Sequence, residues 1–165
     1  MKKLLLVIVL FLIGCAPMFS SSFSAGYGGK VKVNKMPKMG NGFLEYKSYS
    51  HLLEELEKEA EIKMWDSQML KKNKSLIPLG GSIYFRYCRP SAKWSHTIII
   101  KQDGKIIRRY SAEDVLFHSY NEYLNCFTGS ILLYLDKKIT DSINVFIIDE
   151  YAKERYEYTV IPEKK

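Results

Sequence analysis

From Ser82 onward, apolar residues recur at every second position, and this period restricts the C-terminal half of the chain mainly to β-strands. One face of the run 82–88 carries Ile83, Phe85 and Tyr87, and the run 94–100 repeats the pattern with Ile98 and Ile100. Side chains of a strand alternate between its two faces, whereas a helix repeats every 3.6 residues. The pattern therefore predicts strands that each bury one face.

Asp103 and Gly104 lie between two such runs and predict a tight hairpin. A type I′ turn needs positive φ at both central positions, and Asp-Gly is one of the pairs that adopt it most readily. The predicted register places Lys101 opposite Ile106 and Ile100 opposite Ile107.

Three further strands are expected at 131–135, 143–147 and 156–160, with a turn at 150–153. Asp149 and Glu150 lie at this turn, where acidic residues serve local structure. Six strands with antiparallel hairpins favour two packed sheets. The ending, residues 145–149 followed by 156–160, resembles the last hairpin of immunoglobulin-like sandwiches. We therefore predict a mainly β fold, an antiparallel immunoglobulin-like β-sandwich with an N-terminal helix. The alternative is an α+β fold in which one antiparallel sheet is covered by a helix.

The predicted helix runs from Ser50, as its N-cap, to about Asn73. Glu54 and Glu55 follow its start and lysines lie near its end, an arrangement that suits the helix dipole. The apolar stripe moves to another face after residue 61, so we expect either a bend or two halves that touch different surfaces. A second, short helix is predicted within 111–124.

The N-terminus carries a different kind of signal. Lys2 and Lys3 precede ten consecutive apolar residues, 4–13, which form a helix of only about 15 Å. The hydrocarbon core of a bilayer is about 30 Å thick, so this length is typical of a signal peptide. The run ends in Leu12-Ile13-Gly14-Cys15, which resembles the lipobox of bacterial lipoproteins.

This resemblance implies that residues 1–14 are a lipoprotein signal peptide, removed after the Cys15 sulfur receives a diacylglyceryl group. The new amino group of Cys15 is commonly acylated as well. Ala16 stands where an Asp would favour the inner membrane, so the outer membrane or cell surface is favoured. The alternative is an ordinary cleaved signal peptide in which the cysteine has no role.

Charge divides unevenly along the chain. The formal net charge is +7, and removal of Lys2 and Lys3 leaves +5, of which +4 lies between residues 16 and 50. We therefore predict a flexible basic tether at 15–46 and a nearly neutral globular domain at 47–165. The tether lysines would lie near anionic headgroups or belong to a merely soluble linker. A nearly neutral domain argues against nucleic acid as a partner.

Cys88 and Cys126 form an even pair in a chain expected to leave the cytosol, where disulfides are permitted. We expect either a disulfide or two separately buried thiols. An alternative adds His96 and His118, whose residue types would complete a tetrahedral zinc site or a thiol–histidine catalytic pair. The spacings match no zinc motif.

Tyrosine is abundant, with twelve residues in the chain. Those expected in or near strands could form a recognition surface, or they could complete half-buried sheet faces. The predicted function is a non-catalytic binding or structural module of the cell envelope, attached to the membrane by its lipid, whose partner is an envelope protein or polymer. We expect no catalytic residue, cofactor or metal. The alternative is an envelope enzyme or metal-binding protein that uses Cys88, His96, His118 and Cys126.

Overall fold

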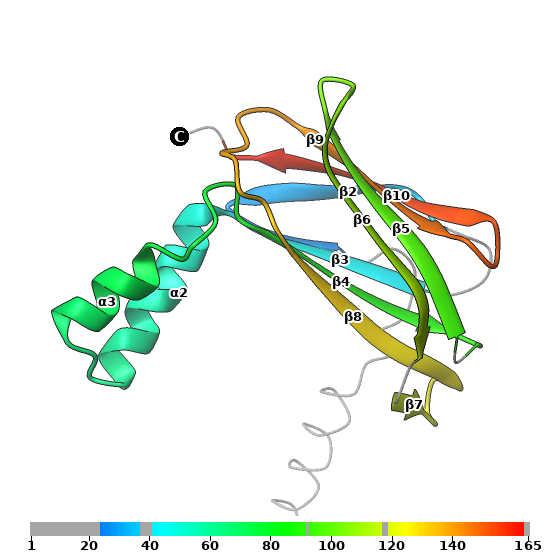
Figure 1. Ribbon diagram of the computed structural model, residues 1–165, viewed down its shortest axis with the longest axis horizontal. Coiled ribbons are helices and arrows are strands. Elements are labelled where there is room, and N and C mark those ends of the chain that lie inside the picture. The colour runs from blue at the N-terminus through cyan, green and yellow to red at the C-terminus, as the bar shows by residue number, and fades with distance from the viewer. Residues whose placement is uncertain (1–23, 37–40, 92, 117–118, 164–165) are drawn as a thin grey trace, which may run out of the picture.

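The computed structural model describes residues 24–36, 41–91, 93–116 and 119–163. Within them the chain is mainly β, with ten strands and two helices (Figure 1). In chain order these are β1 (Ser24–Tyr27), β2 (Gly29–Lys35), β3 (Asn41–Lys47), α2 (Tyr49–Ile62), α3 (Ser67–Lys74), β4 (Ser82–Arg89), β5 (Lys93–Gln102), β6 (Lys105–Leu116), β7 (Ser119–Asn121), β8 (Cys126–Tyr134), β9 (Ile143–Asp149) and β10 (Glu154–Pro162).

The strands form two five-stranded sheets. Sheet 1 has the order β1-β3-β4-β8-β7 and sheet 2 the order β2-β10-β9-β5-β6. All pairings are antiparallel except that of β1 with β3. The alternative prediction of one sheet covered by a helix is therefore wrong.

Side chains from both sheets build one core. The ring of Phe85, on sheet 1, meets the rings of Tyr156 and Tyr158, on sheet 2, edge to face with centroids 5.2 and 6.1 Å apart. These three side chains are at most 1% exposed. Burying a side chain such as Phe85 contributes about 1.5–3 kcal/mol, so the alternating inward residues are what hold the sheets together.

Strands begin much earlier than expected, and the prediction of a flexible tether through residue 46 is wrong from Ser24 onward. In β2, Val31 and Val33 pack against the core while Lys30 and Lys32 face away from it. The strand pairs with β10, and β3 pairs with β4. Residues 15–23, with Cys15, lie outside the described residues, as does the predicted signal peptide 1–14.

The chain passes from sheet 1 to sheet 2 at Gly28. Its φ is +73°, and a Cβ at this position would lie 2.0 Å from Ser48 Oγ. Only glycine combines that backbone conformation with so close a neighbour. The end of β3 and the start of β2 therefore lie close together at the N-terminus of α2.

The predicted helix is confirmed, with different ends and a break. Its N-cap is Ser48, whose Oγ accepts a hydrogen bond from the His51 N–H at 3.3 Å. The helix stops at Ile62, Met64 takes a φ of 51°, and α3 starts after Asp66, whose carboxylate accepts the Met69 N–H at 2.7 Å. The apolar stripe, which changes to another helix face after residue 61, therefore reflects two separate helices. They follow three strands, so the helical part is not N-terminal to the domain, and Figure 1 shows it projecting from one end of the sheets.

The hairpin at Asp103-Gly104 is confirmed, with φ values of 50° and 77°. Lys101 lies opposite Ile106 as predicted, but a register shift then places Ile100 opposite Arg108. The predicted helix within 111–124 is wrong, because β6 continues to Leu116 and β7 follows. Ser111 lies opposite Thr97, and their hydroxyl oxygens are 3.1 Å apart, which extends the ladder.

The remaining predicted strands are confirmed as β4, β5, β8, β9 and β10, and the turn at 150–153 is also present. No helix in the described ranges has the length and apolar character required to cross a bilayer.

Candidate functional site

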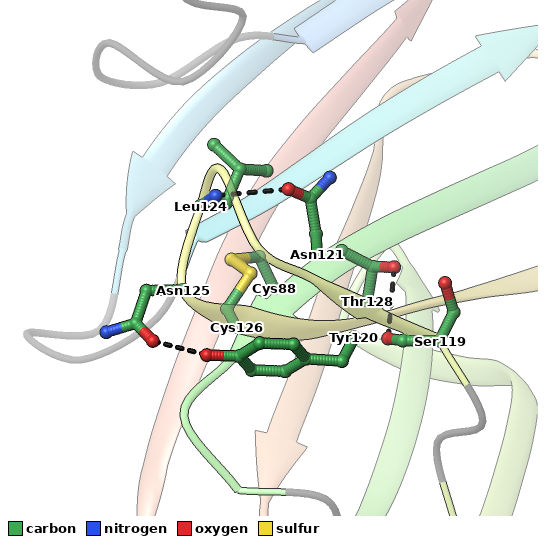
Figure 2. Close-up of a disulfide and its surroundings, with 8 residues drawn as sticks. All are labelled: Cys88, Ser119, Tyr120, Asn121, Leu124, Asn125, Cys126 and Thr128. Carbon is green, nitrogen blue, oxygen red and sulfur yellow. Dashed lines mark hydrogen bonds between the residues drawn. A yellow bond between two sulfur atoms is a disulfide. The ribbon is translucent and has the colours of Figure 1, made fainter.

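Cys88, at the end of β4, and Cys126, at the start of β8, form a disulfide whose Cα atoms are 5.7 Å apart (Figure 2). The bond therefore joins neighbouring strands of sheet 1. Both cysteines are buried, with 6% and 4% of their surface exposed. Of the two states expected for this pair, the disulfide is the one present.

A compact turn, residues 121–125, precedes Cys126 and lies beside the disulfide. Asn121 accepts the Leu124 N–H through its side-chain oxygen at 3.0 Å, and the Tyr120 hydroxyl donates to the side-chain oxygen of Asn125. Asn125 has a φ of 50°, a conformation that asparagine tolerates better than most residues. These local bonds hold the turn against β7 (Figure 2).

Next to Cys88, the side chain of Arg89 enters the space between the sheets and forms an ion pair with Asp149 of β9. The two side chains are only 6% and 3% exposed. The other oxygen of Asp149 accepts the N–H groups of Tyr151 and Ala152 at 3.0 and 2.9 Å, so the carboxylate also closes the turn between β9 and β10. One buried carboxylate thus ties sheet 2 to sheet 1 and fixes a hairpin.

His96 lies directly opposite Asp149 in the ladder between β5 and β9 and is 2% exposed. Burial lowers its pKa to about 4, although the nearby Asp149 carboxylate acts in the opposite direction. The imidazole is therefore neutral at pH 7. Its ring lies 5.8 Å from that of Tyr110 on the neighbouring strand β6.

Tyr156 completes this buried cluster from β10. Burial raises the pKa of its hydroxyl to about 12, so it stays protonated at neutral pH. Counted over the whole residue, Arg89, His96, Asp149 and Tyr156 are all at most 5% exposed. These groups are closed off from solvent. The arrangement serves to fasten the two sheets.

Of the four residues of the alternative site, the structure describes three, Cys88, His96 and Cys126. Both cysteine sulfurs are consumed by the disulfide, and neither is available as a thiolate ligand or nucleophile in this form of the protein. His96 is buried in the cluster with Asp149, and His118 lies outside the described residues. Within the part of the chain that the structure describes, no group of three or more His, Cys, Asp or Glu side chains could hold a metal ion.

The tyrosines do not gather on one surface. Tyr87, Tyr156 and Tyr158 belong to the core, whereas Tyr120 and Tyr123 are exposed beside the disulfide. Of the two alternatives for the tyrosines, packing against a sheet face is therefore the one that holds for Tyr87, Tyr156 and Tyr158. Tyrosines on the inward face of a strand pack, and only those in turns and outward positions remain accessible.

At the other end of the domain, a cleft of about 650 Å³ lies where the helices meet the sheets. Its walls include Ser48 and Ser50 at the start of α2, together with Lys138, Asp141 and Glu163 from the loops that close the sheets. Charges of both signs line it, so its composition favours no particular ligand charge.

The fold and these contacts define a two-sheet β domain with one disulfide, a buried ion pair between the sheets and a projecting helical hairpin. No protein-family model, no curated protein and no solved structure matches the chain.

The sequence did not predict the ion pair. Asp149 was expected to serve a turn, and it does, but nothing local indicates that Arg89, some sixty residues earlier, is its partner. The available signal was Arg89 itself, a charged residue at the end of a run whose other inward residues are apolar.

Proposed function

We propose that the protein is a lipid-anchored component of a bacterial cell envelope and acts as a non-catalytic binding or structural module. The observation that carries the proposal is the lipobox-like ending of the N-terminal apolar run, Leu12-Ile13-Gly14-Cys15, behind Lys2 and Lys3. We further propose the outer membrane or cell surface as its location, on the basis of Ala16.

The disulfide supports export. Disulfides persist in oxidising compartments such as the periplasm and cell surface and are rare in the cytosol. The Cys88–Cys126 bond is therefore consistent with a domain that has left the cytosol.

The distance between anchor and domain would be short. Nine residue steps separate Cys15 from Ser24, the first residue of β1. A fully extended chain spans at most about 3.6 Å per residue, or roughly 32 Å here. In the lipidated protein, the first strand would therefore stay within about one bilayer thickness of the headgroups.

We also propose that the two sheets belong to the immunoglobulin-like class of sandwiches. The support is the final hairpin, in which β9 and β10 pair from Glu154 opposite Asp149 to Val160 opposite Ile143. The disulfide differs from the inter-sheet bridge of antibody domains, because it joins two strands of the same sheet.

Metabolic labelling tests the anchor. Full-length protein is produced in bacteria supplied with radiolabelled palmitate, alongside Cys15→Ala and a control with both Cys88→Ala and Cys126→Ala. Wild type and the double variant should be labelled, and Cys15→Ala should accumulate as unlabelled precursor. Label that survives in Cys15→Ala, or an unlabelled wild type, would refute the anchor.

A further inference from the structure

Basic residues cluster on the outer face of sheet 2. Some of them lie in the segment predicted to be a tether, and the others lie in the domain predicted to be nearly neutral. Because Tyr156, Tyr158 and Val160 face the core, their neighbours in β10 point outward, and the same alternation applies along β2, β5, β6 and β9. We call this surface the cationic face. Its members are Lys30, Lys32, Lys101, Arg109 and Arg155, with Ile99, Phe146 and Ile148 between them.

Strand register brings these side chains together. Phe146 lies opposite Ile99, and Ile99 lies opposite Arg109, so one row crosses three strands. In the next row, Asn144 lies opposite Lys101 and also opposite Thr159.

Hydrogen bonds fasten the polar part of that row. Thr159 Oγ1 donates to Asn144 Oδ1 at 2.9 Å and accepts from Asn34 Nδ2 at 2.7 Å. The row thus continues onto β2, where Lys32 pairs with Thr159 in the ladder.

Phe146 forms the centre of the face. Lys101 Nζ and Arg155 Cζ each lie 5.7 Å from the centroid of its ring. The cationic face has one acidic residue among its described outward positions, Glu157, and its carboxylate bonds Arg155 Nε at 2.6 Å. Five cations against one acid leave a net charge of +4 around a half-buried apolar centre.

Among the described elements, no helix covers this face. The helices α2 and α3 pack mainly on each other and project from one end of the sheets (Figure 1). Neither described helix therefore covers this positively charged face.

We propose that the cationic face docks on the anionic headgroup surface of the membrane that holds the protein. This inference rests on the proposed lipid anchor. Lys30 and Lys32 follow Cys15 by fifteen and seventeen residues, and β2 is the edge strand of sheet 2. The short linking segment, 15–23, thus keeps this edge close to the headgroups. A surface with basic residues around an apolar centre complements an anionic interface, and each basic residue strengthens docking about fivefold.

Lysine footprinting tests the docking on the full lipidated chain. The protein is reconstituted in vesicles of phosphatidylcholine alone or mixed with phosphatidylglycerol, and acetylation rates are measured by mass spectrometry. In the anionic vesicles, Lys30, Lys32 and Lys101 should react at least about fivefold more slowly, and high salt should restore their rates. The exposed helix residues Lys58 and Lys71 should keep the same rate in both. Equal changes in the two sets, or none, would overturn the proposal.

Charge-reversal variants sharpen the test. Lys32→Glu with Lys101→Glu should weaken docking at least about 25-fold and remove the protection of Lys30. The matched control, Lys58→Glu with Lys71→Glu, should leave that protection unchanged, and circular dichroism should show that both variants fold. Loss of protection in both variants would contradict a specific face.

Two further outcomes are informative. Protection of the face by soluble polyphosphate in neutral vesicles, without protection by phosphatidylglycerol, would assign it to an anionic polymer and overturn the membrane assignment. The same spectra report whether Cys15 carries acyl groups. An unacylated chain whose face is still protected on anionic vesicles would refute the proposed anchor and leave the docking face supported.

Discussion

The ion pair between Arg89 and Asp149 is the contact whose removal should affect the domain most. Both side chains are almost fully buried, and they join the two sheets. In Arg89→Met, the Asp149 carboxylate stays buried without its countercharge. Breaking a buried pair in this way costs about 3–5 kcal/mol, a large part of the roughly 5–15 kcal/mol that stabilises a typical domain.

The partner variants separate the ion pair from the other bonds of Asp149. Asp149→Leu should cost about 1 kcal/mol more for each of the Tyr151 and Ala152 N–H bonds it removes. The double variant Arg89→Met/Asp149→Leu leaves no isolated charge, so its cost should fall below the sum of the single costs by about 2–3 kcal/mol.

Urea unfolding followed by circular dichroism measures these free energies. The control is Arg108→Met, which breaks the exposed pair with Asp136 and should cost less than about 1 kcal/mol. A loss for Arg89→Met as small as that of the control, or costs that simply add in the double variant, would refute the role assigned to this pair.

Three further changes test other parts of the fold. Replacing Cys88 and Cys126 by Ala opens a loop with a sequence separation of 38 and should lower the free energy of unfolding by about 4 kcal/mol; a thermal melt with a loss under about 1 kcal/mol would contradict this. The folded-state pKa of His96 is about 4, below the ordinary 6.5, so the unfolded chain binds a proton that the folded chain does not. Stability should therefore fall by about 3 kcal/mol between pH 6.5 and pH 4, and His96→Gln should lack this part of the decline in urea titrations across that range; identical slopes would argue against it. Gly104→Ala should cost about 1 kcal/mol, because Gly104 has a φ of +77° while its added Cβ would meet nothing within 4 Å; a neutral substitution in the same urea assay would argue against the assigned turn.

Sequence patterns correctly predicted those elements of the fold that depend only on neighbouring residues. Asp103-Gly104 determines a turn by its own backbone preference, and the inward residues of β9 and β10 follow from simple alternation. The register beyond Lys101 was wrong because a bulge depends on how two strands pack, which neighbouring residues do not encode.

Two larger predictions were wrong for opposite reasons: the short helix within 111–124 and the flexible tether through residue 46. Within 111–116 the apolar spacing fits a helix, but pairing with β5 across the hairpin is the stronger interaction, and β6 stays extended. In 30–35 the alternation of lysine and valine was a strand signal, and the glycines around it led to the prediction of a tether. Lys30 and Lys32 belong to the cationic face, which is why a domain predicted to be nearly neutral has a charged side.

Residue types alone predicted only the part of the candidate site that involves the cysteines. Cys88 and Cys126 were the natural pair, although spacing alone did not show that they meet. The contact between Arg89 and Asp149 depends on the position of one sheet over the other, and no periodicity in the sequence encodes that.

The proposed lipid anchor is tested most directly by mass spectrometry of the protein isolated from the cells that produce it naturally. We expect a chain that begins at Cys15, with a diacylglyceryl group on the sulfur and acylation of the amino group. A chain that keeps residues 1–14, or one that begins elsewhere and carries no lipid, would contradict it.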